Sequence, residues 1–205
     1  MINDRYEKET AFLSKERYKF AAKLDKKIEK ELKPLKLEQA KFKTEILRDQ
    51  ESKFGCDHVC FTTEINPGSG FKPLNKIASG GELSRFLLAA KLCFFGEDSK
   101  KTQIFDEIDR GVGGATASAI GKRLLELSKH EQVLVVTHSP QVAAYSDNHL
   151  KVEKVNSDKS TITKVATLNE EKTVREIARM LSGELVTSEA LAAAAKLRNT
   201  SRGIS

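Results

Sequence analysis

The 205-residue sequence has no tryptophan and three cysteines, an odd number that does not suit a fully paired disulfide scaffold. Its first residues include no apolar segment of the kind found in secretory signals. No run of about 18 apolar residues occurs, so no membrane-spanning helix is expected. These absences together favour a soluble protein of a reducing compartment.

A complete set of metal ligands is also missing. Cys56, His58 and Cys60 would share one face of a strand, which raises the question of a metal site. A fourth ligand is absent and the spacing fits no zinc knuckle. We therefore expect buried or half-buried free thiols.

Charge is plentiful but uneven. Charged residues make up 31% of the chain, hydrophobic residues 39%, and the net charge is +6. The first 50 residues hold 14 basic and 10 acidic side chains, a net charge of +4. A basic arm suits a polyanion such as DNA, although a solvated helix face would have the same composition.

Residues 4–33 contain neither glycine nor proline, and apolar residues recur at helical spacing. The repeated positions are Leu13, Phe20, Leu24, Ile28 and Leu32. The pattern predicts an amphipathic helix long enough for a coiled coil, which needs a partner helix to bury its seam. No comparable helix is expected elsewhere, so the partner would lie upstream or in a second copy.

Pro34 is expected to end or kink this helix, and residues 36–42 to form a shorter element. We expect residues 1–50 to form an arm and its exit, 51–200 a globular part, and 201–205 a frayed tail. Alternating apolar residues then predict a half-buried strand from His58 to Ile65.

The stretch Ser79–Arg85 joins two glycines to an apolar helix at 86–95. Backbone N–H groups at such a helix N-terminus can hold a phosphate, although a plain helix cap is the commoner use. Residues 96–101 would form a surface connection.

Residues 102–107 predict a short buried strand that ends in two acids, Asp106 and Glu107. A Gly-rich loop at 109–114 and a helix at 115–128 follow, with inward residues Ile120, Leu124, Leu125 and Leu127. Residues 133–137 form an apolar strand typical of a central parallel sheet, and His138 follows it. This order indicates an α/β fold, whose ligands bind at the carboxyl ends of the strands.

The remaining residues predict a helix from Pro140 to about Tyr145, then a hairpin of strands 150–155 and 161–168 joined by a turn at 156–159. Two helices at 170–181 and 189–197 complete the expected elements, with Asn169 and either Thr187 or Ser188 as their N-caps.

Three motifs in this order resemble the nucleotide-binding domain of ABC-type ATPases: Ser79-Gly80-Gly81-Glu82, Ile104–Glu107 and Thr137-His138. The resemblance implies ATP and Mg²⁺ as cofactors. It assigns the signature motif to the first stretch, metal binding to Asp106 and the catalytic base to Glu107. Asp109 would begin the D-loop and His138 would be the switch histidine.

The phosphate cradle of such domains, Gly-x-x-x-x-Gly-Lys-Ser/Thr, is missing. The nearest run, Gly114 to Arg123, has six residues between its glycines and lies within a predicted helix. In SMC-type ATPases the cradle precedes a long coiled coil and the signature half follows it. The chain is similar to that second half: the C-terminal lobe of an ABC/SMC-type head, preceded by a coiled-coil helix.

Within this group, the sequence resembles the RecN family of bacterial DNA repair ATPases over most of residues 10–197. The matching stretches are 13–24, 35–42, 66–68, 77–85, 105–114, 135–144 and 176–183. The pieces at 141–144 and 176–180 are unlike those of transporters and chromosome-condensing relatives. A start at Met1 within the coil leads us to expect a split or truncated gene, or a deliberately shortened chain.

The resemblance implies a part of a repair ATPase in the bacterial cytoplasm, associated with the nucleoid. Its expected partners are double-stranded DNA or DNA ends, a separate half carrying the Walker A cradle, and a second head in an ATP-sandwiched homodimer. The alternative is a non-catalytic remnant or accessory module that binds a partner half or DNA and does not hydrolyse ATP alone.

Overall fold

A computed structural model describes residues 2–94, 101–157, 160–183 and 185–203. The chain forms two compact units, Met1–Asp98 (unit 1) and Ser99–Ser205 (unit 2). The predictions for Phe95, the connection at 96–100, the hairpin turn at 158–159 and the tail at 204–205 lie outside the described residues. Among the described residues, no helix combines the length and apolar character that crossing a membrane requires.

Unit 1 begins with the predicted long helix, α1 (Ile2–Leu32), and Pro34 lies in the short 3₁₀ helix η1 (Lys33–Leu35) that follows. One face of α1 is buried along its length, through Thr10, Ala21, Leu24, Ile28 and Leu32. Two of the predicted seam residues lie outside this face, since Leu13 and Phe20 are exposed.

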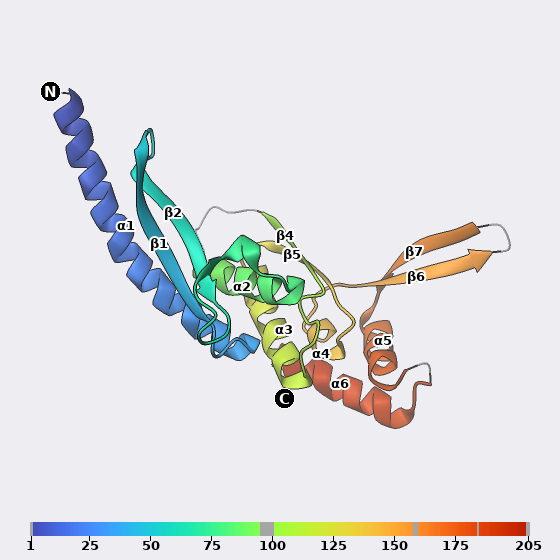
Figure 1. The fold of residues 1–205 in the computed structure, drawn as a ribbon. Coiled ribbons are helices and arrows are strands. Elements are labelled where there is room, and N and C mark those ends of the chain that lie inside the picture. The colour runs from blue at the N-terminus through green and yellow to red at the C-terminus, as the bar shows by residue number, and fades with distance from the viewer. Residues whose placement is uncertain (1, 95–100, 158–159, 184, 204–205) are drawn as a thin grey trace. The chain divides into compact units, whose positions relative to one another are not determined.

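The buried face of α1 packs against a β-hairpin and against helix α2 (Gly80–Cys93). Strands β1 (Lys41–Ser52) and β2 (Gly55–Glu64) pair antiparallel and run beside α1 (Figure 1), and β3 (Lys72–Pro73) adds to β2. Polar contacts fix the hairpin along the helix, including Arg17 Nη1 to Asp57 Oδ2 at 2.9 Å and Thr44 N to Asp25 Oδ1 at 3.0 Å. Only part of the predicted seam is therefore covered within unit 1, and the partner helix expected for Leu13 and Phe20 stays a prediction.

The expected boundary after residue 50 falls inside β1, while the two compact units divide between Asp98 and Ser99. The strand from His58 is confirmed and begins earlier, at Gly55. Its expected inward face is only partly inward, because Val59 is exposed and Thr62 and Thr63 are both buried. A 3₁₀ turn, η2 (Leu74–Lys76), leads to α2 (Gly80–Cys93), which is the last described element of unit 1.

Unit 2 is built on the predicted parallel pair, β4 (Thr102–Asp106) and β5 (Gln132–Val136), connected by α3 (Gly114–Ser128). Ile120, Leu124 and Leu127 of α3 are buried as predicted, and Leu125 is half-buried. The strands themselves are less buried than expected, since Ile104 is 69% exposed and Val136 is 59% exposed. One face of this two-stranded sheet has no cover among the described residues, so the prediction of fully buried central strands is wrong for this chain.

The second half of unit 2 follows the predicted order. Helix α4 (Pro140–Ala143) is shorter than expected. Strands β6 (His149–Ser157) and β7 (Ser160–Leu168) form the predicted antiparallel hairpin, which reaches away from α5 in Figure 1. Helix α5 (Glu170–Ser182) is capped by Asn169 and followed by Gly183, and α6 (Ser188–Arg202) is capped by Thr187.

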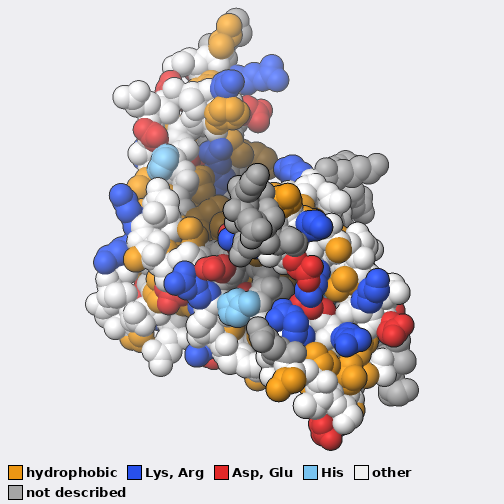
Figure 2. Space-filling view, turned by 90° about the vertical axis from the view of Figure 1, so that its right-hand side faces the viewer, with side chains coloured by type: hydrophobic (Ala, Val, Ile, Leu, Met, Phe, Trp, Pro, Cys, Tyr) orange, Lys and Arg blue, Asp and Glu red, His pale blue; other side chains and the backbone are white. Residues whose placement is uncertain are grey.

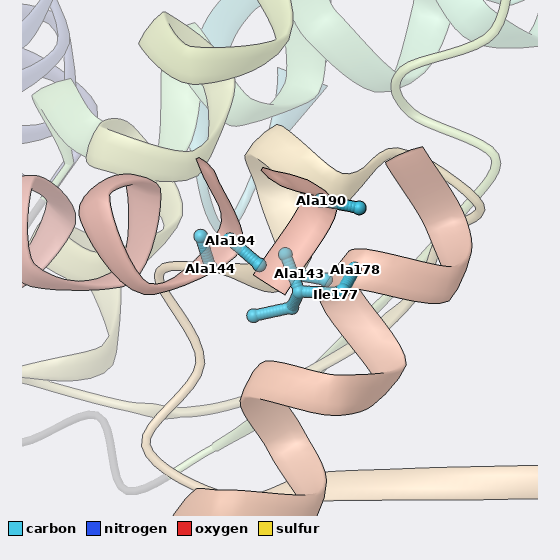
Figure 3. Close-up of a cluster of buried hydrophobic side chains, with 6 residues drawn as sticks. All are labelled: Ala143, Ala144, Ile177, Ala178, Ala190 and Ala194. Atoms are coloured by element: carbon cyan, nitrogen blue, oxygen red, sulfur yellow. The ribbon is translucent and has the colours of Figure 1, made fainter. Parts of the chain in front are cut away.

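Small side chains let α4, α5 and α6 approach closely. Their cluster, drawn in Figure 3, consists of Ala143, Ala144, Ile177, Ala178, Ala190 and Ala194. The predicted frayed tail is wrong for Ser201 and Arg202, because α6 continues through them. Ser201 is buried there and its hydroxyl donates to the Ala144 carbonyl oxygen at 2.6 Å.

Candidate nucleotide site

The predicted signature stretch forms the N-terminus of α2. Ser79 is the N-cap, and its Oγ accepts a hydrogen bond from Glu82 N at 3.4 Å. Ser79 and Gly80 are exposed, whereas Gly81 and Glu82 are half-buried. A Cβ added at Gly80 would meet no atom within 4 Å, so the first turn of α2 is open to an incoming group. The cap and the open amides are compatible with both interpretations of this stretch, helix cap and phosphate contact.

Arg85, one turn further along α2, is a residue to which sequence reasoning gave no role. It is 6% exposed, and its Nε and Nη1 have no hydrogen-bond partner among the described atoms. Burial lowers the pKa of its guanidinium, while the Glu82 carboxylate acts in the opposite direction. A buried cation is stabilised by an anion, so this part of α2 favours a negative partner.

Asp106 and Glu107 lie where expected, at the carboxyl end of β4. In the parallel register Asp106 pairs with Val136, so β4 and β5 end side by side. Both acids are exposed. Glu107 has a positive φ of 50°, which is uncommon for a residue with a side chain, and its N–H donates to the Val136 carbonyl oxygen at 3.2 Å. Such strained backbone is concentrated at functional positions.

The Glu107 carboxylate contacts Arg110 at 3.1 Å in a solvent-exposed ion pair. Exposed pairs of this kind contribute little free energy. The carboxylate can therefore exchange this partner for another at small cost.

Asp109 connects the loop after β4 to the loop after β5. It is buried, and its Oδ2 accepts a hydrogen bond from Thr137 Oγ1 at 2.6 Å. Thr137 Oγ1 in turn accepts from Ser139 N at 2.9 Å. His138, the predicted switch histidine, lies between these two residues and is exposed. The three-residue chain Asp109–Thr137–Ser139 fixes the backbone on both sides of His138.

The run nearest to the cradle motif, from Gly114 to Gly121, lies inside α3 as predicted, and so does not form a phosphate-binding loop. The structure thus brings Asp106, Glu107, Asp109 and His138 to one edge of the β4–β5 sheet in unit 2. Ser79–Glu82 belong to unit 1.

The donors at this edge fit a hydrated Mg²⁺. The described residues contain no group of three or more His, Cys, Asp or Glu side chains arranged to hold a metal ion. Magnesium in nucleotide sites usually has one or two carboxylate ligands, several waters and substrate phosphates, which an exposed Asp106 can accommodate. The second buried oxygen of Asp109, Oδ1, has no partner among the described atoms. Cys56, Cys60 and Cys93 are free thiols, and Cys56 is buried.

No protein-family model matches the chain. The chain is 43% identical over 197 residues to the DNA repair protein RecN of Rickettsia bellii, an alignment that covers 96% of this chain and 36% of that protein. Identity to RecN of Vibrio cholerae is 40% over 187 residues, covering 90% of this chain and 34% of the relative. Identity to RecN of Streptomyces coelicolor is 47% over 148 residues, covering 72% and 26%.

Among solved structures, the Smc head domain with a coiled coil and joint from Pyrococcus yayanosii superposes with a TM-score of 0.56 at 18% identity, covering 88% of this chain and 32% of that one. The Smc head domain with an extended coiled coil from Pyrococcus furiosus gives 0.54 at 18% identity, covering 88% and 42%. The fold is therefore that of an SMC-type ATPase head. The chain spans about a third of the length of the curated relatives it matches. It belongs to the RecN family, as a match to the C-terminal half of its members.

Proposed function

We propose that this chain supplies one half of a composite ATP site in a RecN-like ATPase that acts in recombinational repair of DNA double-strand breaks. The observation that carries the proposal is the convergence of Asp106, Glu107, Asp109 and His138 at one sheet edge. The sequence has no Gly-x-x-x-x-Gly-Lys-Ser/Thr run. The nucleotide would therefore be held by a cradle that lies outside these 205 residues.

The roles follow from the chemistry of each side chain. Bound ATP and Mg²⁺ supply the phosphoryl group and neutralise its charge. Asp106 would hold the ion through water, and Glu107 would orient the attacking water and accept its proton. His138 would contact the γ-phosphate, held in place by the Asp109–Thr137–Ser139 chain.

The signature residues, Ser79, Gly80, Gly81 and Glu82, would act in trans. Their amides at the start of α2 would meet the γ-phosphate carried by a second head, which makes the expected assembly a homodimer with ATP between heads. The buried Arg85 behind this turn adds positive charge for the same purpose.

The uncovered strand faces of unit 2 support the idea of a missing half. Ile104, Leu134 and Val136 are exposed on β4 and β5, and Val152 and Val165 are exposed on the β6–β7 hairpin. Hydrophobic side chains also reach the surface on the face drawn in Figure 2. Contiguous apolar surface on strands marks an interaction site, and a further layer of the head would bury it.

The test is reconstitution. The chain alone is expected to show no ATP hydrolysis, and a mixture with the Walker A half of a relative such as Rickettsia bellii RecN is expected to be active. Glu107→Gln should lower the activity of the mixture by about 10²-fold or more, because the base is lost. Glu126→Gln, an exposed acid on α3, is the matched control and should leave the activity unchanged.

Two outcomes would overturn the proposal. One is an unchanged rate for Glu107→Gln in the mixture. The other is hydrolysis by the isolated chain that Glu107→Gln abolishes, because the chain would then hold a complete site. A mixture that assembles without hydrolysing ATP would favour the second candidate, a non-catalytic accessory module, which the absent cradle also supports.

A further inference from the structure

Helix α1 carries basic residues at a regular helical spacing along one side. They recur at steps of three, four or seven residues from the first turn to the last: Arg5, Lys8, Lys15, Lys19, Lys23, Lys26 and Lys30. We call these seven side chains the basic stripe. At 3.6 residues per turn they fall within an arc of about 80° and extend over roughly 38 Å of helix.

All seven side chains are exposed, and none of the acidic residues of α1 falls within the same arc. Between Lys8 and Lys15, the position on the same side of the helix is occupied by Phe12, which is 64% exposed. The acids of α1 lie outside the arc, and two of them fix the hairpin: Asp25 accepts from Thr44 N, and Glu29 accepts from Phe42 N. The acids nearest the stripe, Asp4 and Glu16, lie about 20° beyond its edges, so the arc itself holds charge of one sign.

The basic stripe lies opposite the packed face. The buried residues of α1 pack within unit 1, where β1, β2 and α2 all contact the helix, and they are centred about 180° around the helix from the stripe. They are Thr10, Ala21, Leu24, Ile28 and Leu32. The stripe is therefore the part of α1 that faces furthest from its own unit. This geometry leaves it available to a large, straight partner.

Helix stability does not explain this arrangement. Five neighbouring pairs in the stripe are like-charged at three- or four-residue spacing, such as Lys15–Lys19 and Lys19–Lys23, and such pairs destabilise a helix. A solvated helix usually interleaves the two signs to gain ion pairs. In the stripe, Lys19 reaches Glu16 at 3.5 Å, an exposed contact of small value.

We propose that the basic stripe of α1 binds the phosphates of duplex DNA, without reading sequence. This inference rests on the proposed function, and it adds the surface through which the repair protein would hold DNA. A duplex presents regularly spaced negative charge along a straight path, which matches a line of cations about 38 Å long. An anionic membrane is the alternative that the experiment tests. A membrane-surface helix inserts its apolar face, and the buried residues of α1 are not available for this because they pack within unit 1.

The experiment compares two variants with the same loss of charge. The stripe variant carries Lys19→Gln, Lys23→Gln, Lys26→Gln and Lys30→Gln. The control carries Lys27→Gln, Lys122→Gln, Lys129→Gln and Lys172→Gln, all exposed and all outside the stripe. Gln keeps helix propensity close to that of Lys, and far-UV circular dichroism and thermal melting confirm that each variant is folded.

Binding to a 30-base-pair duplex is measured by fluorescence anisotropy between 50 and 200 mM salt, without nucleotide or partner half. For the stripe variant we expect at least tenfold weaker binding at 50 mM salt and a salt slope smaller by about 3 to 4, close to one unit for each phosphate that the variant no longer neutralises. The control should stay within about threefold of the unmodified chain.

Equal losses in the two variants would overturn the proposal, since net charge alone would then account for binding. No binding of the unmodified chain at 50 mM salt would also overturn it. So would tighter, stripe-dependent binding to vesicles of anionic phospholipid. ATP hydrolysis by the mixture with a Walker A half is a separate readout, so a failure of the stripe and a failure of the composite site can be distinguished.

Discussion

At the scale of single residues, Thr137 is the side chain on which the candidate site most depends. Its hydroxyl donates to the buried Asp109 carboxylate and accepts from Ser139 N, so one group connects two loops. The other carboxylate oxygen of Asp109 has no partner among the described atoms. Loss of the hydroxyl would leave a buried carboxylate without this hydrogen bond.

Thr137→Val should therefore lower the free energy of unfolding by about 1–3 kcal/mol, the penalty for leaving a buried polar group unsatisfied. Thr137→Ser keeps the hydroxyl and should lose less than half of that. Urea unfolding of both variants measures the difference. Equal stability of the valine and serine variants would contradict the role of this hydrogen bond.

The sequence was sufficient to predict that Asp106, Glu107 and His138 would lie at one sheet edge, because the carboxyl ends of adjacent parallel strands share that edge. It did not identify Thr137 as a connector or Arg85 as a buried cation. The first depends on the distance between two loops, and the second on what covers α2, neither of which has a local sequence pattern. The positive φ of Glu107 likewise has no signal in the residues around it.

At the scale of elements, helix ends were the most predictable feature. Asn169 and Thr187 accept hydrogen bonds from the first turns of α5 and α6, as the capping preferences require. The partner of α1 was not predictable, because a helical repeat indicates that a face is buried and does not indicate whether a helix or a hairpin buries it. Residues 41–52 include many charged residues, which obscured the alternation of buried Phe42 and Ile46 in β1.

The docking of α6 depends on Arg198, which is 2% exposed. Its guanidinium donates to the Ala144 carbonyl oxygen at 2.8 Å, to the Ser146 carbonyl oxygen and to both carboxylate oxygens of Glu170. Burial of the guanidinium is stabilised only while these acceptors surround it. This one side chain thus connects the end of α4, the start of α5 and α6.

Arg198→Met should lower the free energy of unfolding by about 2–4 kcal/mol, because the Ala144 and Ser146 carbonyl groups and the Glu170 carboxylate each lose a donor, although Ser201 still donates to Ala144. Arg202 contacts the same Glu170 at 3.4 Å from a more exposed position. Arg202→Met should cost less than about 1 kcal/mol, as for other solvent-exposed pairs. Thermal melting of the two variants gives the comparison, and a similar loss in both would contradict the importance of the buried contacts.

At the scale of the whole molecule, the main departure from expectation is the uncovered strand surface of unit 2. The apolar run at 133–136 predicted a strand buried on both faces, as in a complete α/β sheet. The parallel pairing is confirmed, but Ile104, Leu134 and Val136 stay exposed on β4 and β5. The exposed face is what the proposed composite head would cover with its other half.

The β6–β7 hairpin offers a test of that interpretation that leaves Asp106, Glu107 and His138 unchanged. Val152 and Val165 are directly opposite each other and are 64% and 63% exposed. Replacing both with Thr keeps the branched shape that strands favour and adds two hydroxyl groups. In the isolated chain this should change the free energy of unfolding by less than about 0.5 kcal/mol, as for most surface substitutions.

In the mixture with a Walker A half, the same double variant should need about tenfold more partner to reach half-maximal ATP hydrolysis, since hydroxyl groups would be buried at the contact. Leu185→Thr, an 82% exposed residue between α5 and α6, is the control and should change neither measurement. If the double variant assembled as well as the unmodified chain, the hairpin face would not be the surface that the other half covers. The valines would then have to serve a different contact, because an exposed apolar strand surface is otherwise prone to aggregation.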